Sequence, residues 1–227
     1  MALKYDFNRI ALMWRPEKGQ RRICVGYITI AKNSDDIRFE YLDSGIAEAK
    51  KVDSNFSGYP GLSIDDNKQF SSLQVSEVFF GRLINQSRND ADDFYDFWLV
   101  DKSRVEDSLY VLAQTQGLSF SDMFEFVPQY FSSHRPSFIT DIAGLSKSDF
   151  KLDKLTIGDT LQFTRETDNK FDPKAVYVSF NGEKIGYIKK GHNSIFNRKN
   201  ISGIKLTVWS YIDLPGFEKL YVRVDIK

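Results

Sequence analysis

The chain has 227 residues, enough for one large or two ordinary domains with substantial cores. Its hydrophobic content of 41% indicates a globular protein, and its formal net charge of zero excludes the strongly basic composition of an obligate nucleic-acid binder. The charge is unevenly placed, because residues 1–135 hold 16 basic and 20 acidic side chains whereas residues 136–227 hold 15 and 11.

Cysteine usage and hydropathy bear on the compartment. Cys24 is the only cysteine, which excludes a disulfide within the chain, and its place in the apolar run Ile23–Val25 predicts a buried side chain. No apolar run approaches the roughly 18 residues that a membrane helix needs, and we recognise no signal peptide before residues 3–6. We therefore expect a cytoplasmic protein that does not contact a membrane.

The first predicted elements are two strands. Residues 22–30 and 37–42 are rich in β-branched and aromatic side chains, and the polar residues 32–36 separate them, so we expect a β-hairpin. Residues 43–71 are rich in turn-forming side chains, and an ordered aromatic loop is expected at 56–62.

Helical periodicity follows the hairpin. Apolar side chains recur at helical spacing in residues 75–83 and 94–98. Residues 103–106 have the spacing of a capping box, which predicts the start of a helix that ends at Gly117. A shorter helical turn is expected from residues 121–122. The front of the chain is therefore predicted to be a β-hairpin followed by helices.

A polar stretch with a proline near each end, residues 128–137, is the best candidate for a linker. Proline lacks a backbone donor and restricts the residue before it, so regular elements commonly end at such points. We place a front domain at residues 1–130, a linker at 131–136 and a second domain at 137–227.

Several segments of the front domain resemble the N-terminal subdomain of HipA-type kinases. They are Val25–Ile28, Phe39–Leu42, Phe79–Leu83 with Arg88 downstream, and Leu112–Gly117 leading to Asp122–Phe126. In that family the subdomain precedes a catalytic core or exists as a separate partner protein in toxin–antitoxin sets. The resemblance implies recruitment of a protein partner, with Arg88 as the candidate contact. An ordinary solvated helix face is the alternative for Arg88.

The second domain contains a turn between two strand-like runs. Residues 161–163 and 175–180 favour strands, and residues 168–173 between them have the composition of a turn. Asn181-Gly182 then predicts a two-residue hairpin loop that leads into a further strand at 184–188.

This part of the chain resembles the HIRAN domain. The matching segments are Arg165-Glu166, Asp168-Asn169, Phe171-Asp172-Pro173, Ala175-Val176 and Gly186-Tyr187-Ile188. The similarity runs from about Ser137, through Ile142–Leu145, to a last strand at 220–226. It implies a small β-barrel related to OB and SH3-like barrels, in a family found fused to helicases and in bacterial proteins. Together with the front domain, the expected fold class is α+β.

The resemblance also implies a binding site, because HIRAN domains grip single-stranded DNA and one branch captures a free 3′ end. Asn169, Phe171 and Asp172 fall where that branch places its turn asparagine, its stacking ring and its acceptor for the 3′ hydroxyl. Single-strand binders in general use cations for phosphates and aromatic faces for bases. The candidate nucleic-acid-binding residues are Asn169, Lys170, Phe171, Asp172, Lys174, Lys184, Tyr187, Lys189, Lys190 and His192.

Several of these residues have a structural alternative. Phe171 is alternatively a plug in the barrel mouth, and Asn169 and Asp172 alternatively serve to form the turn. His192 is alternatively an exposed residue at the start of a helix. Ser146–Ser148 stands where the end-capturing branch has a basic residue and an aromatic pair, so we expect general strand binding and not capture of a 3′ end.

Enzymatic chemistry finds no support in the sequence. Only His134 and His192 can supply imidazole, and neither phosphate-loop glycines nor Cys/His metal spacings occur, so we expect no catalytic site, metal or cofactor. The predicted function is a non-catalytic accessory or regulatory protein. Its barrel binds single-stranded DNA or DNA ends and its front domain recruits a partner. The alternatives are a protein-interaction or antitoxin-like regulator whose barrel does not bind nucleic acid and, third, an unrecognised carboxylate nuclease.

Overall fold

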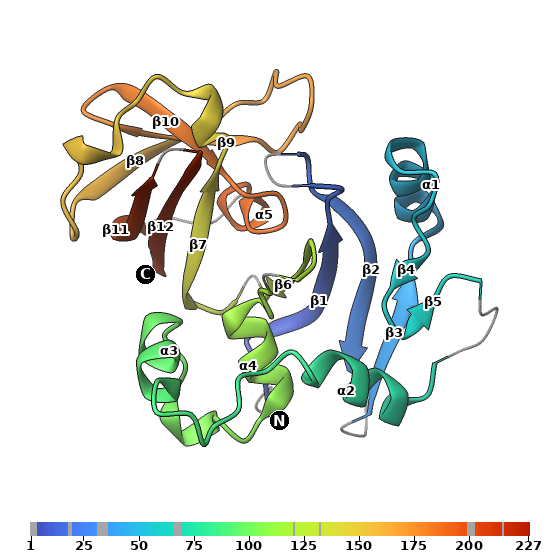
Figure 1. Cartoon of the computed structure of the whole chain (residues 1–227). Coiled ribbons are helices and arrows are strands. Elements are labelled where there is room, and N and C mark those ends of the chain that lie inside the picture. The colour runs from blue at the N-terminus through green and yellow to red at the C-terminus, as the bar shows by residue number, and fades with distance from the viewer. Residues whose placement is uncertain are drawn as a thin grey trace. The chain divides into compact units, whose positions relative to one another are not determined.

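A computed structural model describes residues 4–17, 20–30, 36–65, 70–119, 121–131, 133–198, 203–214 and 216–227. The chain divides into two compact units, Met1–Tyr130 and Phe131–Lys227 (Figure 1). Helices and strands both contribute, which confirms the expected α+β class. None of the described helices has the length and apolar character that crossing a bilayer requires.

The first unit contains an antiparallel four-stranded sheet in the order β3-β2-β1-β6. Its strands are β1 (Phe7–Trp14), β2 (Ile23–Ile30), β3 (Ile37–Tyr41) and β6 (Phe124–Tyr130). The predicted hairpin is confirmed, since β2 and β3 pair from Gly26 opposite Tyr41 to Ile30 opposite Ile37. Residues 32–35 of the expected turn lie outside the described residues.

Two strands of this sheet differ from the sequence expectation. β1 was not predicted, because its residues from Ile10 to Trp14 are all buried and show no alternation. β6 follows the residues 121–122, where a helical turn was expected, and it includes Pro128, where the linker was expected to begin. Both expectations are wrong. Pro128 is compatible with β6 because β6 lies at the edge of the sheet, where a missing backbone donor costs least.

A helix occupies part of the region that was predicted to be turn-rich, and that prediction is corrected here. α1 (Asp43–Val52) packs against β2 through Gly45, where an added Cβ would clash with the carbonyl oxygen of Cys24. The aromatic loop expected at 56–62 forms the short pair β4 (Gly58–Tyr59) and β5 (Leu62–Ser63).

The remaining helices of the first unit agree with the periodicity, apart from one start. α2 (Ser72–Phe80) and α3 (Ala91–Phe97) lie where helical spacing placed them. The predicted capping box does not begin a long helix, because its residues fall in the short 3-10 helix η1 (Lys102–Arg104) and the turn after it. α4 (Ser108–Thr115) begins later, where the Asp107 carboxylate accepts the N–H of Tyr110 at 3.1 Å.

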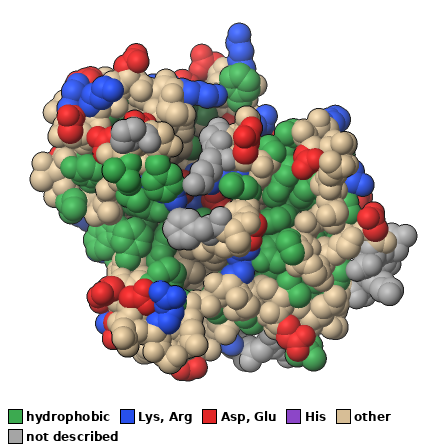
Figure 2. Space-filling view, viewed as in Figure 1, with side chains coloured by type: hydrophobic (Ala, Val, Ile, Leu, Met, Phe, Trp, Pro, Cys, Tyr) green, Lys and Arg blue, Asp and Glu red, His purple; other side chains and the backbone are tan. Residues whose placement is uncertain are grey.

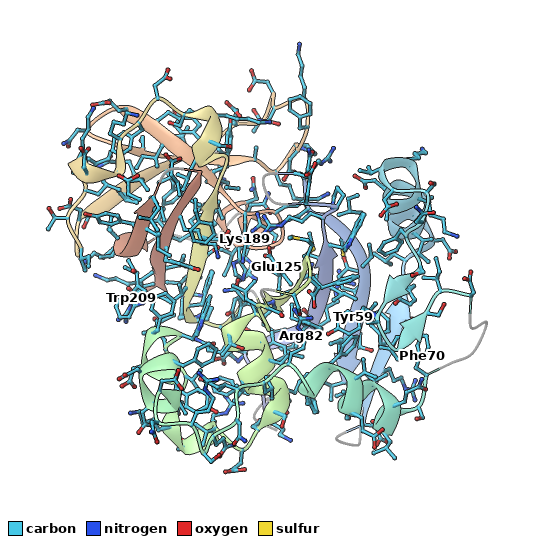
Figure 3. All side chains as sticks on the ribbon, in the orientation of Figure 1. Tyr59, Phe70, Arg82, Glu125, Lys189 and Trp209 are labelled. Atoms are coloured by element: carbon cyan, nitrogen blue, oxygen red, sulfur yellow. The ribbon has the colours of Figure 1, made fainter. Side chains whose placement is uncertain are left out.

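One buried arginine joins several elements of the first unit. Arg82 follows α2, and its guanidinium donates to both carboxylate oxygens of Asp122, at 2.6 and 3.0 Å. It also donates to the carbonyl of Gly117 at 2.6 Å and to the hydroxyl of Tyr59 at 2.9 Å (Figure 3). Arg82 therefore ties α2 to the end of α4, to β4 and to the segment that leads into β6.

The second unit is a closed barrel in the strand order β10-β7-β12-β11-β8-β9. The strands are β7 (Ser137–Ala143), β8 (Thr160–Arg165), β9 (Val176–Phe180), β10 (Glu183–Ile188), β11 (Ile204–Leu214) and β12 (Phe217–Ile226). Short helices connect some of them: η2 (Leu145–Lys147), η3 (Leu152–Lys154) and α5 (Asn193–Phe196). This barrel confirms the second half of the predicted fold.

Alternation along the barrel strands separates the core from the outer face. Val176 and Val178 of β9 are fully buried, whereas Tyr177 between them is half-buried. The predicted hairpin loop is present, with Asn181 and Gly182 at φ 49° and 85°, the left-handed conformations that a tight hairpin requires. The strands β8, β9 and β10 thus present one continuous outer face, with the β8–β9 connection at its end (Figure 1).

Candidate nucleic-acid interface

The connection between β8 and β9 is organised by one asparagine. The side-chain oxygen of Asn169 accepts the N–H groups of Phe171 at 2.9 Å and Asp172 at 3.0 Å. Its amide nitrogen donates to a carboxylate oxygen of Glu166 at 2.5 Å. Asn169 therefore forms the turn, which was the alternative to ligand binding. Both polar atoms of its side chain are used in these hydrogen bonds.

Phe171 projects from this turn into solvent. Its side chain is 73% exposed, which excludes the alternative that it plugs the barrel mouth. Lys170 and Lys174 on either side are exposed, and neither has an ion pair with a carboxylate among the described residues. An exposed ring between two cations combines the two kinds of contact that a single strand offers, base faces and phosphates.

Asp172 connects the turn to α5. One carboxylate oxygen accepts the N–H of Lys174 at 2.9 Å, and the other accepts the side-chain amide of Asn193 at 2.7 Å. Asn193 also donates to the carbonyl of Lys174 at 2.9 Å. Both oxygens of Asp172 thus already hold the turn in place, which is the role of an ordinary turn acceptor.

Lys184 and Tyr187 of β10 form a cluster with Glu166. The Lys184 ammonium donates to the Tyr187 hydroxyl at 2.6 Å and lies 3.3 Å from Glu166, and the same hydroxyl donates to Glu166 at 2.9 Å. Hydrogen bonds from Asn169 and Tyr187, helped by Lys184, hold the pKa of Glu166 below its ordinary value. Desolvation alone lowers the pKa of Lys184, but its bonds to Tyr187 and Glu166 outweigh that effect and raise it.

Two predicted surface contacts are buried, and their assignment to the surface is corrected here. Lys189 has no exposed area, and its ammonium lies 2.7 Å from the Asp141 carboxylate (Figure 3). His192 is 2% exposed, and its Nδ1 lies 2.9 Å from the Thr140 hydroxyl. Both side chains therefore lie in the folded interior. Neither can contact a phosphate at the surface as predicted, and His192 is also not the exposed residue at a helix start that its alternative described.

Of the remaining candidates, Lys190 is partly exposed beyond β10. Tyr177 of β9, which was not among the residues predicted from the sequence, lies directly opposite Tyr187. Its signal was the alternation of Val176, Tyr177 and Val178, which places the tyrosine on the outer face. The structure thus brings Asn169, Phe171, Asp172 and Lys174 together at the turn, and Glu166, Tyr177, Lys184 and Tyr187 together on the strands beside it.

Arg88, the candidate partner contact, is exposed in the first unit. Its guanidinium forms an ion pair with Asp90 at 2.7 Å, and both side chains are more than half exposed. It lines a small pocket of about 210 Å³ together with Asp92 and Lys102. Its role in recruiting a partner stays a prediction.

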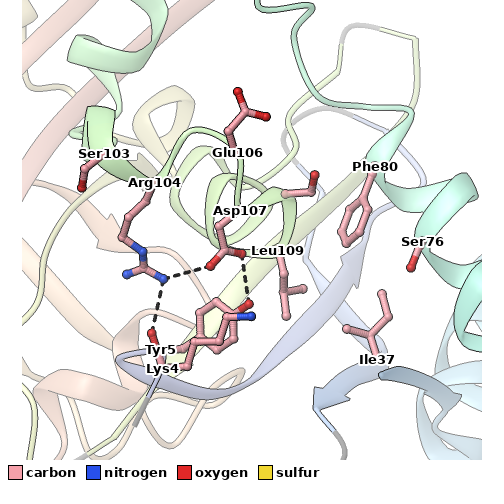
Figure 4. Close-up of a pocket in the computed structure, with 11 residues that line it drawn as sticks. Lys4, Tyr5, Ile37, Ser76, Phe80, Ser103, Arg104, Glu106, Asp107 and Leu109 are labelled. Carbon is pink, nitrogen blue, oxygen red and sulfur yellow. Dashed lines mark hydrogen bonds and ion pairs between the residues drawn. The ribbon is translucent and has the colours of Figure 1, made fainter. Parts of the chain in front are cut away.

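A larger pocket of about 610 Å³ also lies in the first unit (Figure 4). Three of its lining residues are engaged with one another: Asp107 accepts a hydrogen bond from the Tyr5 hydroxyl at 3.0 Å and lies 3.3 Å from Arg104. Burial, followed by the charge of Asp107, raises the pKa of Tyr5 to about 12. Because Asp107 also caps α4, these groups serve to hold the start of that helix.

Among the described residues, no three His, Cys, Asp or Glu side chains are grouped to hold a metal ion.

A small closed barrel with an exposed ring on a rigid turn is thus the class of module that the second unit defines. Comparison with known families gives its name, because the HIRAN domain matches residues 136–203. This match confirms, for residues 136–203, the resemblance that the motif predicted. A solved structure, the HIRAN domain of human HLTF, is 18% identical, with a TM-score of 0.33, and the match covers 40% of this chain and 74% of that one. No curated protein matches the chain. The family match does not extend to residues 1–130, where the HipA-type resemblance stays a prediction.

Proposed function

We propose that the barrel binds single-stranded DNA or DNA ends, and that the chain acts as a non-catalytic accessory protein. The observation that carries the proposal is the exposure of Phe171 on a turn that Asn169 holds rigid. Because the core does not use this ring, its face is accessible to a base. Stacking of a base on such a ring contributes about 1–3 kcal/mol.

The positive charge beside the ring supports a nucleic-acid ligand. Residues 136–227 carry a net charge of +4, and Lys170, Lys174 and Lys190 are available on or next to the turn and β10. Contacts of this kind release counterions from the strand, so affinity should fall steeply with salt. With only a few phosphate contacts, the expected affinity is modest.

Binding along the strand has more support than capture of a 3′ hydroxyl. An end-capturing site needs an acceptor aimed at the hydroxyl, and both oxygens of Asp172 already accept hydrogen bonds from the protein. Ser146–Ser148, which stand where the end-capturing branch has a basic residue and an aromatic pair, contain no aromatic ring and supply no second stacking surface.

The decisive experiment compares labelled oligonucleotides by fluorescence anisotropy at about 50 mM and about 200 mM salt. Single-stranded, duplex and 3′-blocked DNA of the same sequence should be tested side by side. Preference for the single strand, strong salt dependence and indifference to the 3′ block are the expected results. Absence of binding to every oligonucleotide at the lower salt concentration would refute the proposal.

A second candidate function is a protein-interaction or antitoxin-like regulator whose barrel does not bind nucleic acid. One observation favours it: acidic and basic side chains are interspersed over the visible face of the barrel, and Lys184 is already paired with Glu166 (Figure 2). If the barrel binds a protein, or if the first unit recruits one, that partner should copurify with the chain. Pull-down with and without nuclease separates the cases, because a partner bridged by DNA is lost on nuclease treatment and a direct partner stays.

A further inference from the structure

Two tyrosines lie side by side on the outer face of the barrel. Tyr177 of β9 is directly opposite Tyr187 of β10, and the same cross-strand row continues to Thr164 on β8 and Ala143 on β7. Both tyrosines are half-buried, so part of each ring stays accessible. Neighbouring aromatic rings on an outer sheet face are not needed for the core, which Val176 and Val178 fill from the other side.

A cation lies over both rings. The ammonium of Lys184 is 4.8 Å from the centre of the Tyr177 ring and 4.4 Å from that of Tyr187. The register of β9 and β10 shifts between Lys184 and Gly186, and after this shift Gly186 faces Val178 and Tyr187 faces Tyr177. Two rings and an ammonium group therefore share one small area of the surface.

Hydrogen bonds connect this area to the turn that carries Phe171. The Tyr187 hydroxyl donates to Glu166 at 2.9 Å, and the Asn169 amide donates to the same carboxylate. Asn169 in turn accepts the N–H of Phe171. The tyrosine pair and the turn that carries Phe171 are thus connected by three consecutive hydrogen bonds.

We propose that the Tyr177–Tyr187 face, with Lys184, is a second nucleic-acid subsite that continues the path from Phe171. Tyr177 provides a stacking surface for a base, and Lys184 exchanges Glu166 for a phosphate of the bound strand. The chain then binds an internal stretch of single strand that passes across β9 and β10. This inference rests on the proposed function, and it adds the form of the ligand: a continuous strand that needs no free end.

The chemistry favours this occupant over others. Sheet faces that bind single strands stack successive bases on aromatic side chains of neighbouring strands, and cations beside the rings neutralise the backbone. The tyrosine pair offers this arrangement, with the exposed Lys170 and Lys174 at its Phe171 end. Continuity with the turn and complementary charge both point to the same polyanion.

The test uses the full chain and labelled oligo-dT of about 4 and about 12 nucleotides, together with a closed single-stranded circle. Tyr177→Ala should weaken binding of the longer oligonucleotide by roughly 5- to 150-fold, the range that loss of one stacked base gives, and leave the shorter one unchanged. Tyr177→Phe keeps the ring and should bind like the parent. Ser179→Ala, at the next outward position of β9, is the matched control and should also bind normally.

The outcomes separate the two proposals. If Phe171→Ala weakens binding while Tyr177→Ala changes neither length, or if the circle fails to bind, the second subsite is refuted and the proposed function stands. If Tyr177→Ala weakens both lengths equally, its effect acts through the turn and the subsite is again refuted. Loss of a protein partner with unchanged DNA binding would assign the face to a protein. If no oligonucleotide binds the parent, both proposals fall.

Discussion

The side-chain oxygen of Asn169 lies 2.9 Å from the backbone nitrogen of Phe171 and accepts its hydrogen. This bond fixes the backbone of the turn, while the phenylalanine ring itself stays 73% exposed. The position of the ring is therefore set by the main chain and not by packing of the ring. Removing the ring should leave the turn intact, which makes Phe171 a clean site for testing function.

We expect Phe171→Ala to weaken single-strand binding by about 1–3 kcal/mol, because one stacked base is lost. Stability should change by no more than about 0.5 kcal/mol, since the ring is not part of the core. Ile157→Ala, which removes another exposed apolar side chain of the same unit at 65% exposure, is the control. Anisotropy titrations and thermal unfolding measure both quantities. Equal binding by the two variants would argue against a stacking role.

Glu166→Gln should strengthen single-strand binding. The change removes a negative charge beside the proposed path and frees Lys184 from its ion pair. One more available cation should steepen the dependence of log affinity on log salt by about 0.7. Asp168→Asn removes a charge from the same turn without touching Lys184 and serves as the control. If both variants change the slope alike, the effect is one of overall charge, and Lys184 has no particular part in it.

The low pKa of Glu166 predicts a pH dependence of stability. Because its pKa in the folded state lies below the ordinary carboxyl value, the ionised form stabilises the fold. This contribution is fully present above the pKa of the unfolded chain and is lost as the pH falls through the folded-state pKa. The stability difference between the parent and Glu166→Gln should therefore shrink on acidification, as urea unfolding at several pH values would measure. A difference that is constant with pH would contradict this account.

Lys189 is expected to act on stability. Lys189→Met leaves the Asp141 carboxylate without its 2.7 Å ion pair, and breaking a buried pair on one side costs about 3–5 kcal/mol. Adding Asp141→Asn should recover part of the loss, because the carboxylate charge that Lys189 neutralises is removed as well. DNA affinity per folded molecule should not change. A stable Lys189→Met protein with weakened DNA binding would restore the original assignment of Lys189 to the interface.

Arg82 should be the corresponding stability residue of the first unit. Its guanidinium donates to Asp122, Tyr59 and Gly117, so Arg82→Ala should cost about 3–5 kcal/mol. Arg88→Ala removes an exposed arginine that forms an ion pair with the exposed Asp90, and we expect it to cost about 0–1 kcal/mol. Chemical denaturation of the two variants measures the difference. Similar losses would show that the Arg82 network contributes little.

The turn and hairpin of the barrel were predictable because their signals are local. Asn169 and Asp172 favour turns through their own side chains, and Asn181-Gly182 favours a tight hairpin through backbone conformation, as the structure confirms. The burial of Lys189 depends on Asp141, which is far away in the sequence, and no local pattern reports it. Lysine is rarely buried unless it is paired, so composition alone placed it on the surface.

The errors in the first unit have a similar cause. β1 is buried over five consecutive residues, and a short continuous apolar run does not distinguish a strand from a helix. α1 contains Gly45, which lowers helix propensity but permits the close approach to β2. In both cases the tertiary environment decided the local structure, and the sequence pattern alone favoured another answer.

Closure of the barrel has a consequence for how this module recognises anything. Each of its six described strands has a neighbour on both sides for at least part of its length, so the closed part of the barrel offers no edge for pairing with another chain. Recognition by this closed part then resides in side chains and in the turns between strands. Fold and binding are therefore separable in this domain. A few substitutions on its outer surface should abolish ligand binding while the barrel stays folded.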